Sequence, residues 1–422
     1  MFLILRLAWA SLRNRMFTTI LTVVSIALSV MLLLSVERLR RGAEEGFTQT
    51  ISQTDLIVGS RSGPLNLLLY TVFNMGSATA NVSWESYQYW KSQPQVEWTI
   101  PYSLGDGHRG FRLVATDENF YKHYRFRGDQ SIEFAEGTRA QGMWDVVLGA
   151  EVARTLGYKL GQKVVIAHGV TSGEGILHHD DKPFTVVGIM KSTGTALDQS
   201  LYTTLEGMEA IHMDWKDGAA PRRDQAIAQD QIKESDIKIN QITSFFLRTK
   251  SRIETLRLQR AINTYTEEPM MAIIPGVTLS ELWRSMGYVE KTLKAISWLV
   301  LAVGLIAMLI ALLSLLEQRR REMAILRAMG ASPRHVLSLL LIEALLLSIL
   351  GAAVGTALQV ASFAILEKWL AESFGVYLAG AVLSTSDLMY LASAIVAGTL
   401  IGLIPALRAL MLTLKDGLSV KS

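Results

Sequence analysis

The sequence has 422 residues, of which 50% are hydrophobic, with a net charge of +3 and no cysteine. A chain this apolar, with a positive mean hydropathy, is not an ordinary soluble protein, so we expect membrane spans beside a soluble part. The small net charge and the lack of a compact basic motif argue against nucleic acid as a partner. Without cysteine, neither a disulfide nor a thiolate metal site can form.

The first 36 residues predict a surface helix followed by a membrane span. Residues 1–15 place Arg6, Arg13 and Arg15 at helical spacing among apolar residues, which is typical of an amphipathic helix on the cytoplasmic membrane face. Residues 16–36 carry no charge and are long enough to cross a hydrocarbon core of about 30 Å. No small-x-small cleavage site follows them, so we expect a retained anchor.

Residues 37–296 contain no second spanning run and predict a large extracytoplasmic domain with a helical stalk at its start. Its alternating and helical patterns favour an α+β fold, with a charged, Gln-rich stretch at 216–238 as an exposed insertion. The apolar stretch 64–73 predicts a buried helix or strand, and contact with membrane lipid or a partner is the alternative. We expect helices at 83–92, 149–156, 252–263 and 279–296, and strands at 96–103, 111–116, 163–167, 184–190 and 239–248.

Three further apolar runs follow, at 297–316, 336–366 and 388–414. Residues 317–335 between the first two are rich in arginine, whereas residues 367–387 carry acidic residues. The positive-inside rule therefore places 317–335, both termini and the tail 415–422 in the cytoplasm. The expected fold is an α-helical membrane protein with four transmembrane helices and a large α+β extracytoplasmic domain between helices 1 and 2.

The arginine-rich hairpin predicts a short connecting helix and then a sharp corner. Residues 322–329 are strong helix formers, Gly330 suits a helix end, and Ser332 with Pro333 suits a new helix start. An apolar stripe lies beside a cationic one, so a cytoplasmic protein could bind this helix. The alternative is that the arginines only fix the topology. The stripes are formed by Met323, Leu326 and Met329, and by Arg320 and Arg327.

The hairpin also resembles the signature of ABC transporter permeases of the MacB/FtsX/LolC type, an FtsX-like family. That signature is a basic pair, a glutamate, an ILRAxGAS helix and an apolar helix with EA, present here as Arg320, Arg321, Glu322, residues 325–332, Glu343 and Ala344. The family's outer-domain pattern is matched by Gly149, Ala153, Gly157 and Gly161, and its C-terminal pattern by Pro405, Ala406 and Arg408. The tail departs from the family, because Lys415, Asp416 and Gly417 replace its usual proline-containing end. The order of one span, a large outer domain and three spans is also that of the family.

The resemblance implies a non-catalytic, multi-pass subunit of the bacterial inner membrane that works as a dimer with separate ABC ATPase subunits. No G-x-x-x-x-G-K-[ST] loop occurs in the sequence, so we expect ATP and Mg²⁺ on the partner ATPase and no cofactor bound directly. ATP-driven closure would push the connecting helix and move the outer domain, for efflux or for extraction of lipoproteins or other substrates, with a periplasmic adaptor as a further partner. The resemblance implies ATPase contacts by Arg320, Glu322, Met323, Leu326, Arg327, Met329 and Gly330. An alternative is mechanotransmission without transport, activating a periplasmic partner such as a hydrolase.

Two features within the apolar runs suggest helix packing and an intramembrane polar contact. Gly351 with Gly355, and Gly398 with Gly402, form G-x-x-x-G spacings that let helices approach closely, within one chain or across a dimer. Glu343 lies about 10 Å into its helix and should have a partner, either Arg408 or a residue of a neighbouring subunit. A locally hydrated structural contact is the alternative.

The outer domain contains one concentration of possible metal ligands. It comprises His168, His178, His179, Asp180, Asp181 and His212, of which we take His168, His178, His179 and Asp180 as candidates for zinc or another divalent ion. Their spacing fits no catalytic motif such as H-E-x-x-H, and exposed loop histidines are the more common outcome. A metal-binding membrane enzyme is therefore the less favoured alternative function.

Overall fold

The computed structural model describes residues 2–169, 179–215, 227–318, 325, 329, 331–374 and 383–416. It divides into two compact units. The membrane unit comprises Met1–Gly42, Met286–Trp369 and Leu378–Ser422, and the large domain comprises Ala43–Ser285 with Leu370–Tyr377.

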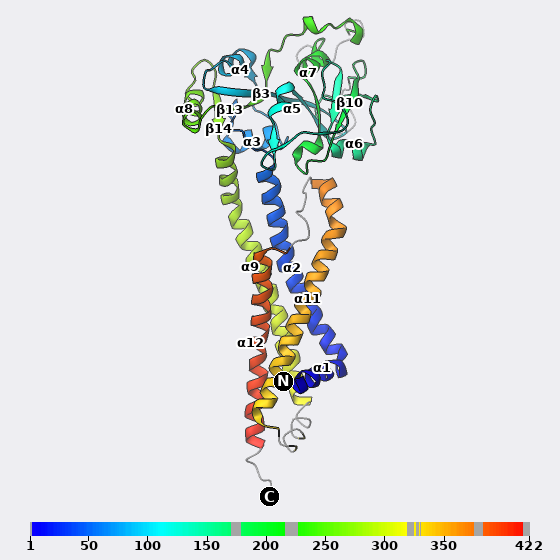
Figure 1. The fold of residues 1–422 in the computed structure, drawn as a ribbon, viewed down its shortest axis with the longest axis vertical. Helices are drawn as coiled ribbons and strands as arrows, with labels where there is room; N and C mark the ends of the chain where they lie inside the picture. Colours follow the sequence, from blue (N-terminus) through cyan, green and yellow to red (C-terminus); the bar gives the residue numbers. More distant parts are fainter. Residues whose placement is uncertain are drawn as a thin grey trace. The chain divides into compact units, whose positions relative to one another are not determined.

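The membrane unit is built from long helices, drawn in blue, yellow, orange and red in Figure 1. Four stretches are long and apolar enough to cross a membrane: Met16–Gly42, Gly287–Ser314, Arg334–Leu366 and Thr385–Met411. Apolar side chains from all four helices pack against one another, including Ile26, Leu305, Leu347 and Ala394. The helices are α1 (Phe2–Asn14), α2 (Met16–Gln49), α9 (Pro275–Gln318), α11 (Pro333–Phe374) and α12 (Thr385–Asp416).

Two of these helices are longer than the sequence pattern predicts. Helix α9 begins at Pro275, ahead of the expected helix at 279, because Pro275 fits the first turn of a helix. Helix α11 continues to Phe374, so the expected loop 367–387 was wrong over 367–374. Glutamate, lysine, leucine and alanine in that stretch favour helix, and neither glycine nor proline interrupts it before Gly375.

The large domain is organised around a ten-stranded sheet with the strand order β14-β1-β13-β3-β4-β11-β8-β10-β7, where β9 pairs with β10. The pairs β4–β11 and β8–β10 are parallel, and the other neighbours are antiparallel. Its strands are β1 (Leu56–Ser60), β3 (Val96–His108), β4 (Phe111–Thr116), β7 (Phe134–Gly137), β8 (Asp145–Leu148), β9 (Lys163–Val164), β10 (Phe184–Met190), β11 (Ser200–Thr204), β13 (Ser244–Thr249) and β14 (Met270–Ile273). Two small sheets pair β2 (Val82–Ser83) with β12 (Gln241–Ile242), and β5 (Arg125–Phe126) with β6 (Gln130–Ser131).

Helices cover both faces of the large sheet, and the central strands are therefore buried on both sides. Successive residues of β13 show this, because Phe245 and Leu247 join one apolar cluster and Phe246 joins the other. Side chains of α4, α6, α7 and α8 belong to the first cluster, and those of α3 and α5 to the second. The helices are α3 (Pro64–Val72), α4 (Trp84–Lys91), α5 (Glu118–His123), α6 (Ala150–Leu156), α7 (Leu205–His212) and α8 (Arg252–Asn263), with short 3₁₀ turns at Ala196–Gln199, Gln229–Gln231 and Glu234–Asp236.

Most expected elements of the large domain are present, and the differences arise at strand ends. The stretch 64–73 is a helix whose Leu67, Leu68 and Tyr70 are buried, so it is not a free contact surface. The strand expected at 163–167 is only β9, and Ala167 instead forms an isolated bridge with Gly107. This bridge brings the residues after Ala167 next to the end of β3.

Candidate functional site

One cluster of polar side chains in the large domain combines Asp106, His168, His179 and His212. One ligand atom from each of the four residues lies within 4.8 Å of the other three. Asp106 is at the centre: its Oδ1 lies 3.4 Å from His168 Nδ1, and its Oδ2 lies 3.3 Å from His179 Nε2 and 3.1 Å from His212 Nε2. We call these four residues the His/Asp cluster.

Each member of the His/Asp cluster comes from a different part of the chain. Asp106 lies near the end of β3, and His168 directly follows the Gly107–Ala167 bridge. His179 is positioned by its backbone N–H, which donates to the Ile166 carbonyl at 2.9 Å. His212 is the last residue of α7. The fold therefore assembles the cluster from segments that are far apart in sequence.

Burial differs strongly among these side chains. Asp106 and His179 have side chains 3% and 0% exposed, whereas His212 is 29% and His168 43% exposed. Trp215 covers the rings, stacking on His168 at a centroid distance of 4.8 Å and lying 4.6 Å from His179. The cluster is thus closed on one side by protein and open at His168.

The electrostatics of the cluster are set by the buried carboxylate. Burial opposes ionisation of Asp106, but His179 and His212 outweigh it and hold the pKa of that carboxyl well below its usual range. Burial likewise disfavours charge on His212, yet the nearby Asp106 carboxylate and the hydrogen bond to the Met208 carbonyl raise the pKa of its ring. The Gly169 backbone N–H also donates to Asp106 Oδ1 at 3.3 Å.

The predicted metal candidates coincide only partly with this cluster. His168 and His179 belong to it, Asp180 is exposed and is not a member, and His178 lies outside the described residues. The neighbouring Asp181 contacts Lys182 at 3.2 Å. Asp106 was missed because it lies more than 60 positions before the histidines, within a strand. The short sequence GDGH, which places two glycines in a strand, is the only local signal.

A second polar site lies in the membrane unit, where α2, α9 and α12 meet. Glu37 of α2 is 4% exposed and is approached by Arg40 Nη2 at 2.8 Å and by Lys294 Nζ of α9 at 3.6 Å. Arg41 Nη2 contacts Asp387 Oδ2 of α12 at 2.5 Å. Helix α2 leads from the membrane unit into the large domain, which begins at Ala43. Glu37 therefore lies toward the end of the membrane unit from which the chain enters that domain. We call Glu37, Arg40, Arg41, Lys294 and Asp387 the ion-pair network.

The four glycines of the G-x-x-x-G spacings lie at helix contacts within the chain. A Cβ at Gly351 would come within 2.6 Å of Ile26, and one at Gly355 within 2.6 Å of the Ala27 carbonyl, so α11 approaches α2 closely at both. Likewise, a Cβ at Gly398 would lie 2.1 Å from Ser348 Oγ, and one at Gly402 would lie 2.3 Å from Ala344 Cβ.

Comparison with known proteins gives the family of the chain. The family model for the MacB-like periplasmic core domain matches residues 19–264, and that for the FtsX-like permease C-terminal region matches residues 294–414. The chain belongs to the MacB/FtsX family of ABC transporter permeases. The large domain of this permease is therefore a periplasmic domain, and its apolar helices make it a multi-pass protein of the bacterial inner membrane.

The permease has a curated relative in Wolinella succinogenes, the macrolide export ATP-binding/permease protein MacB. The two are 24% identical over 371 residues, which cover 86% of this chain and 53% of the relative. The permease thus spans about half the length of that protein.

Two solved structures are also similar to the permease, at low scores. The periplasmic region of MacB from Actinobacillus actinomycetemcomitans has a TM-score of 0.36 and 10% identity, covering 55% of this chain and 94% of that one. The extracellular domain of the noncanonic ABC-type transporter YknZ from Gram-positive bacteria has a TM-score of 0.29 and 11% identity, covering 52% and 98%.

The expected ATPase-contact helix of the permease is described only at two positions. Ile325 and Met329 are 59% and 72% exposed. The other expected contacts, Arg320, Glu322, Met323, Leu326, Arg327 and Gly330, lie outside the described residues. Their contact with an ATPase stays a prediction.

The intramembrane polar pair of the permease also stays a prediction. Glu343 is buried on α11, with an exposed fraction of 2%, and Arg408 is exposed on α12. Burial of a carboxylate in an apolar helix is consistent with a structural or functional contact at that level.

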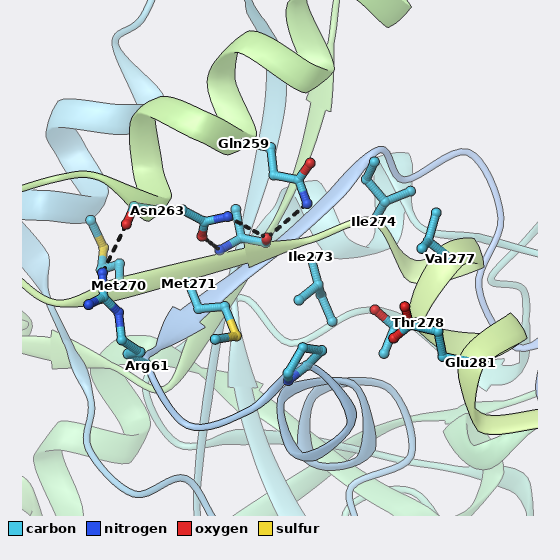
Figure 2. Close-up of a pocket in the computed structure, with 12 residues that line it drawn as sticks. Arg61, Gln259, Asn263, Met270, Met271, Ile273, Ile274, Val277, Thr278 and Glu281 are labelled. Atoms are coloured by element: carbon cyan, nitrogen blue, oxygen red, sulfur yellow. Dashed lines mark hydrogen bonds between the residues drawn. The ribbon is translucent and has the colours of Figure 1, made fainter. Parts of the chain in front are cut away.

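Figure 2 shows a pocket of about 500 Å³ in the periplasmic domain, between α8, β14 and the start of α9. Its floor is fixed by the Asn263 side chain, which pairs with the Ala272 backbone at 2.7 and 3.4 Å. Met270, Met271 and Ile273 line it beside Arg61. Polar and charged side chains, among them Gln259, Thr278 and Glu281, share the lining with these apolar ones, and the mixture indicates no particular ligand chemistry.

Proposed function

We propose that this permease couples ATP hydrolysis by a separate ABC ATPase to mechanical motion of its periplasmic domain. The observation that carries the proposal is the family match over both the periplasmic domain and the C-terminal helices. The Wolinella succinogenes relative is an ATP-binding/permease protein, and this sequence holds no phosphate-binding loop. We place the ATPase on a separate polypeptide, with the permease as its non-catalytic subunit.

In this mechanism the arginine-rich hairpin receives the motion of the ATPase on the cytoplasmic side, where both termini also lie. A second copy of the permease completes the assembly, and two ATPases bind the two hairpins. Motion then reaches the periplasmic domain through α2 and α9, which connect the main part of that domain, Ala43–Ser285, to the membrane unit. The ion-pair network supports this proposal, because it ties α2, α9 and α12 together beside both connections.

The work performed in the periplasm is efflux or extraction of a lipoprotein or other substrate, with an adaptor as partner. The chain's resemblance to a macrolide export protein supports export as the first class to test. The alternative is that the same motion of the periplasmic domain activates a hydrolase and transports nothing.

The test is purification of the permease in mild detergent, followed by identification of bound proteins and assay of ATP hydrolysis. We expect an ABC ATPase to co-purify, and Arg327→Glu to weaken its binding, because the substitution reverses a charge on the proposed contact helix. Arg252→Glu, on α8 of the periplasmic domain, is the matched control and should retain the ATPase. Retention of the ATPase by the Arg327 variant would contradict the assigned contact, and its absence from the wild type under several mild conditions would overturn the proposal.

A further inference from the structure

We propose that Asp106, His168, His179 and His212 form a binding site for one Zn²⁺ ion in the periplasmic domain. Three imidazoles and one carboxylate are a ligand set that zinc takes in proteins, and imidazole is suited to divalent transition metals in general. The proposal rests on the geometry of the His/Asp cluster and not on the family, because the sequence motifs that carry the family resemblance do not include these four residues.

The distances from Asp106 to the three histidines are close to those that tetrahedral coordination requires. Zinc binds nitrogen and oxygen ligands at about 2.0–2.2 Å, so neighbouring ligand atoms of a tetrahedron lie about 3.3–3.6 Å apart. The three contacts of Asp106 with the histidines measure 3.4, 3.3 and 3.1 Å. These contacts involve both oxygens of Asp106, and the four ligand atoms lie within 4.8 Å of one another, so the side chains would need to close in by up to roughly 1 Å to coordinate an ion.

The hydrogen bonds around the cluster leave the ligand atoms facing inward. The Nδ1 of His212 contacts the Met208 carbonyl at 3.0 Å, and because a carbonyl can only accept, this nitrogen carries the proton. Its Nε2 is then the atom directed at Asp106, 3.1 Å away. A hydrogen bond from the remote ring nitrogen to a carbonyl is the arrangement that orients metal-bound histidines.

His179 gives the most direct indication of a bound ion, because hydrogen bonds with the described residues do not satisfy its buried ring nitrogens. Its side chain is fully buried, and within the described part of the chain neither of its ring nitrogens has a hydrogen-bond partner of good geometry. Asp106 Oδ2, which faces both His179 and His212, likewise lacks one there. A buried polar atom without a partner costs about 1–3 kcal/mol, so the two that face each other, His179 Nε2 and Asp106 Oδ2 at 3.3 Å, are better explained by an ion held between them.

The bound ion would cross-link parts of the domain that are distant in sequence. Two of its ligands would be Asp106 of β3 and His212 at the end of α7. The other two would be His168, which follows the Gly107–Ala167 bridge, and His179, which precedes β10. With four protein ligands, such a site would hold the ion rather than activate water on it. His168, the most exposed ligand, is the position at which a partner could exchange the ion.

The test is zinc binding to the full-length permease, purified with a tag that contains no histidine and stripped with a chelator. We expect one tightly bound Zn²⁺ per chain when the protein competes with a chromogenic chelator. His168→Ala and His212→Gln, which alter partly exposed ligands, should each weaken binding by roughly two orders of magnitude or more, since even an outer hydrogen-bond partner is worth 10–100-fold. Asp180→Asn and His123→Ala, which change residues outside the cluster, should bind as the wild type does.

Co²⁺ provides a second measurement that does not depend on affinity. Bound at the cluster, it should show the visible absorption of tetrahedral coordination, and the spectrum should change in His168→Ala while circular dichroism shows the fold intact. Wild-type protein without stoichiometric Zn²⁺ at micromolar free metal would overturn the proposal. So would equal binding by the folded His168 and His212 variants, or a loss in Asp180→Asn as large as theirs.

Discussion

Lys182 is the most deeply buried cation among the described residues of the periplasmic domain, with a side-chain exposure of 0%. Its ammonium group lies 2.6 Å from the Asp214 carboxylate, which also accepts from the Ile227 backbone N–H at 3.0 Å. The pair anchors the residues next to His179 and Trp215. A buried charge is tolerated only with such a partner, so this pair fixes the chain close to His179 and Trp215.

Asp214→Asn should destabilise the periplasmic domain by about 3 kcal/mol, because it leaves the buried Lys182 charge with only the partly exposed Asp181 carboxylate, 3.2 Å away, as a partner. We expect a fall in thermal midpoint of roughly 6–12 °C for a domain of this size. The matched control is Glu133→Gln, which breaks the exposed pair with Lys191 and should change the midpoint little. Equal falls in the thermal midpoint of the two variants would show that the buried Lys182–Asp214 pair stabilises the domain no more than the exposed Lys191–Glu133 pair does.

Asp117 should make the stability of the domain depend on pH. It caps α5 by accepting from the Asn119 N–H at 3.0 Å, and burial raises its pKa to about 6 although the Lys91 charge opposes this. Because the folded-state pKa is above the ordinary 3.8, the associated stabilisation is complete below about pH 4 and is lost as the pH rises through 6.

Asp117→Asn should therefore flatten the dependence of the thermal midpoint on pH between 4.5 and 7, with a loss of about 1–2 kcal/mol of the wild-type change. Ser251→Ala removes the corresponding cap of α8 without a titrating group. It should lower the midpoint by a similar amount at every pH. A pH profile of Asp117→Asn that parallels the wild type would contradict the assignment.

At the level of elements, the membrane helices approach one another through small residues. Gly355 allows α11 to lie against the backbone of α2, and Gly304 of α9 similarly faces Ser29 of α2, where a Cβ would lie 2.6 Å from the serine oxygen. Ser29 also donates to the Val300 carbonyl at 3.1 Å. Close packing and interhelical hydrogen bonds, not hydrophobic burial, are what hold helices together in lipid.

Gly355→Ala should destabilise the membrane unit, because the added Cβ would lie 2.6 Å from a backbone carbonyl that cannot move aside alone. The cost should be about 1–3 kcal/mol, read as a lower unfolding temperature in detergent. Gly287→Ala on α9 is the matched control, since nothing lies within 4 Å of its added Cβ. It should be neutral or slightly stabilising, because alanine favours helix over glycine. If both substitutions behave alike, Gly355 is not a packing position.

At the scale of the whole molecule, the proposed function requires the ATPase-facing helices to move the periplasmic domain. Among the described residues, the ion-pair network joins the helices α2, α9 and α12 through charged side chains, and Glu37 is at its centre. Replacing Glu37 removes the negative charge that Arg40 and Lys294 share. The helices would then keep their apolar contacts, the Arg41–Asp387 pair and the contact of Arg40 with Glu290 of α9 at 3.5 Å, but lose the shared carboxylate between Arg40 and Lys294.

Glu37→Gln should therefore leave ATPase binding intact and reduce the ATP-dependent change in the periplasmic domain. Limited proteolysis of that domain within the complex, with and without ATP and vanadate, measures the change, and we expect the nucleotide-induced difference to fall severalfold. Lys291→Gln on α9, an exposed residue outside the network, should behave as the wild type. An unchanged proteolysis difference in Glu37→Gln would remove the network from the mechanism.

The sequence alone determined the membrane spans, the position of the large domain and the family, because these depend on local properties. A span is a run of about twenty apolar residues, and the family signature near Glu322 is a contiguous string. Helix caps such as Ser83 are equally local, and α4 begins where that residue predicts. Helix ends were less well predicted, as α11 shows, because a charged stretch after a span can remain helical.

Only the tertiary structure decided which distant residues meet. Asp106 joins His168, His179 and His212 because strand pairing and the Gly107–Ala167 bridge bring the end of β3 beside them, and no spacing in the sequence records that pairing. In the same way, Gly351 and Gly355 predict close packing by their spacing, but only the bundle shows that α2 is what they approach. Sequence patterns record what each residue prefers locally, whereas a site depends on the register and packing of segments that the chain separates by many residues.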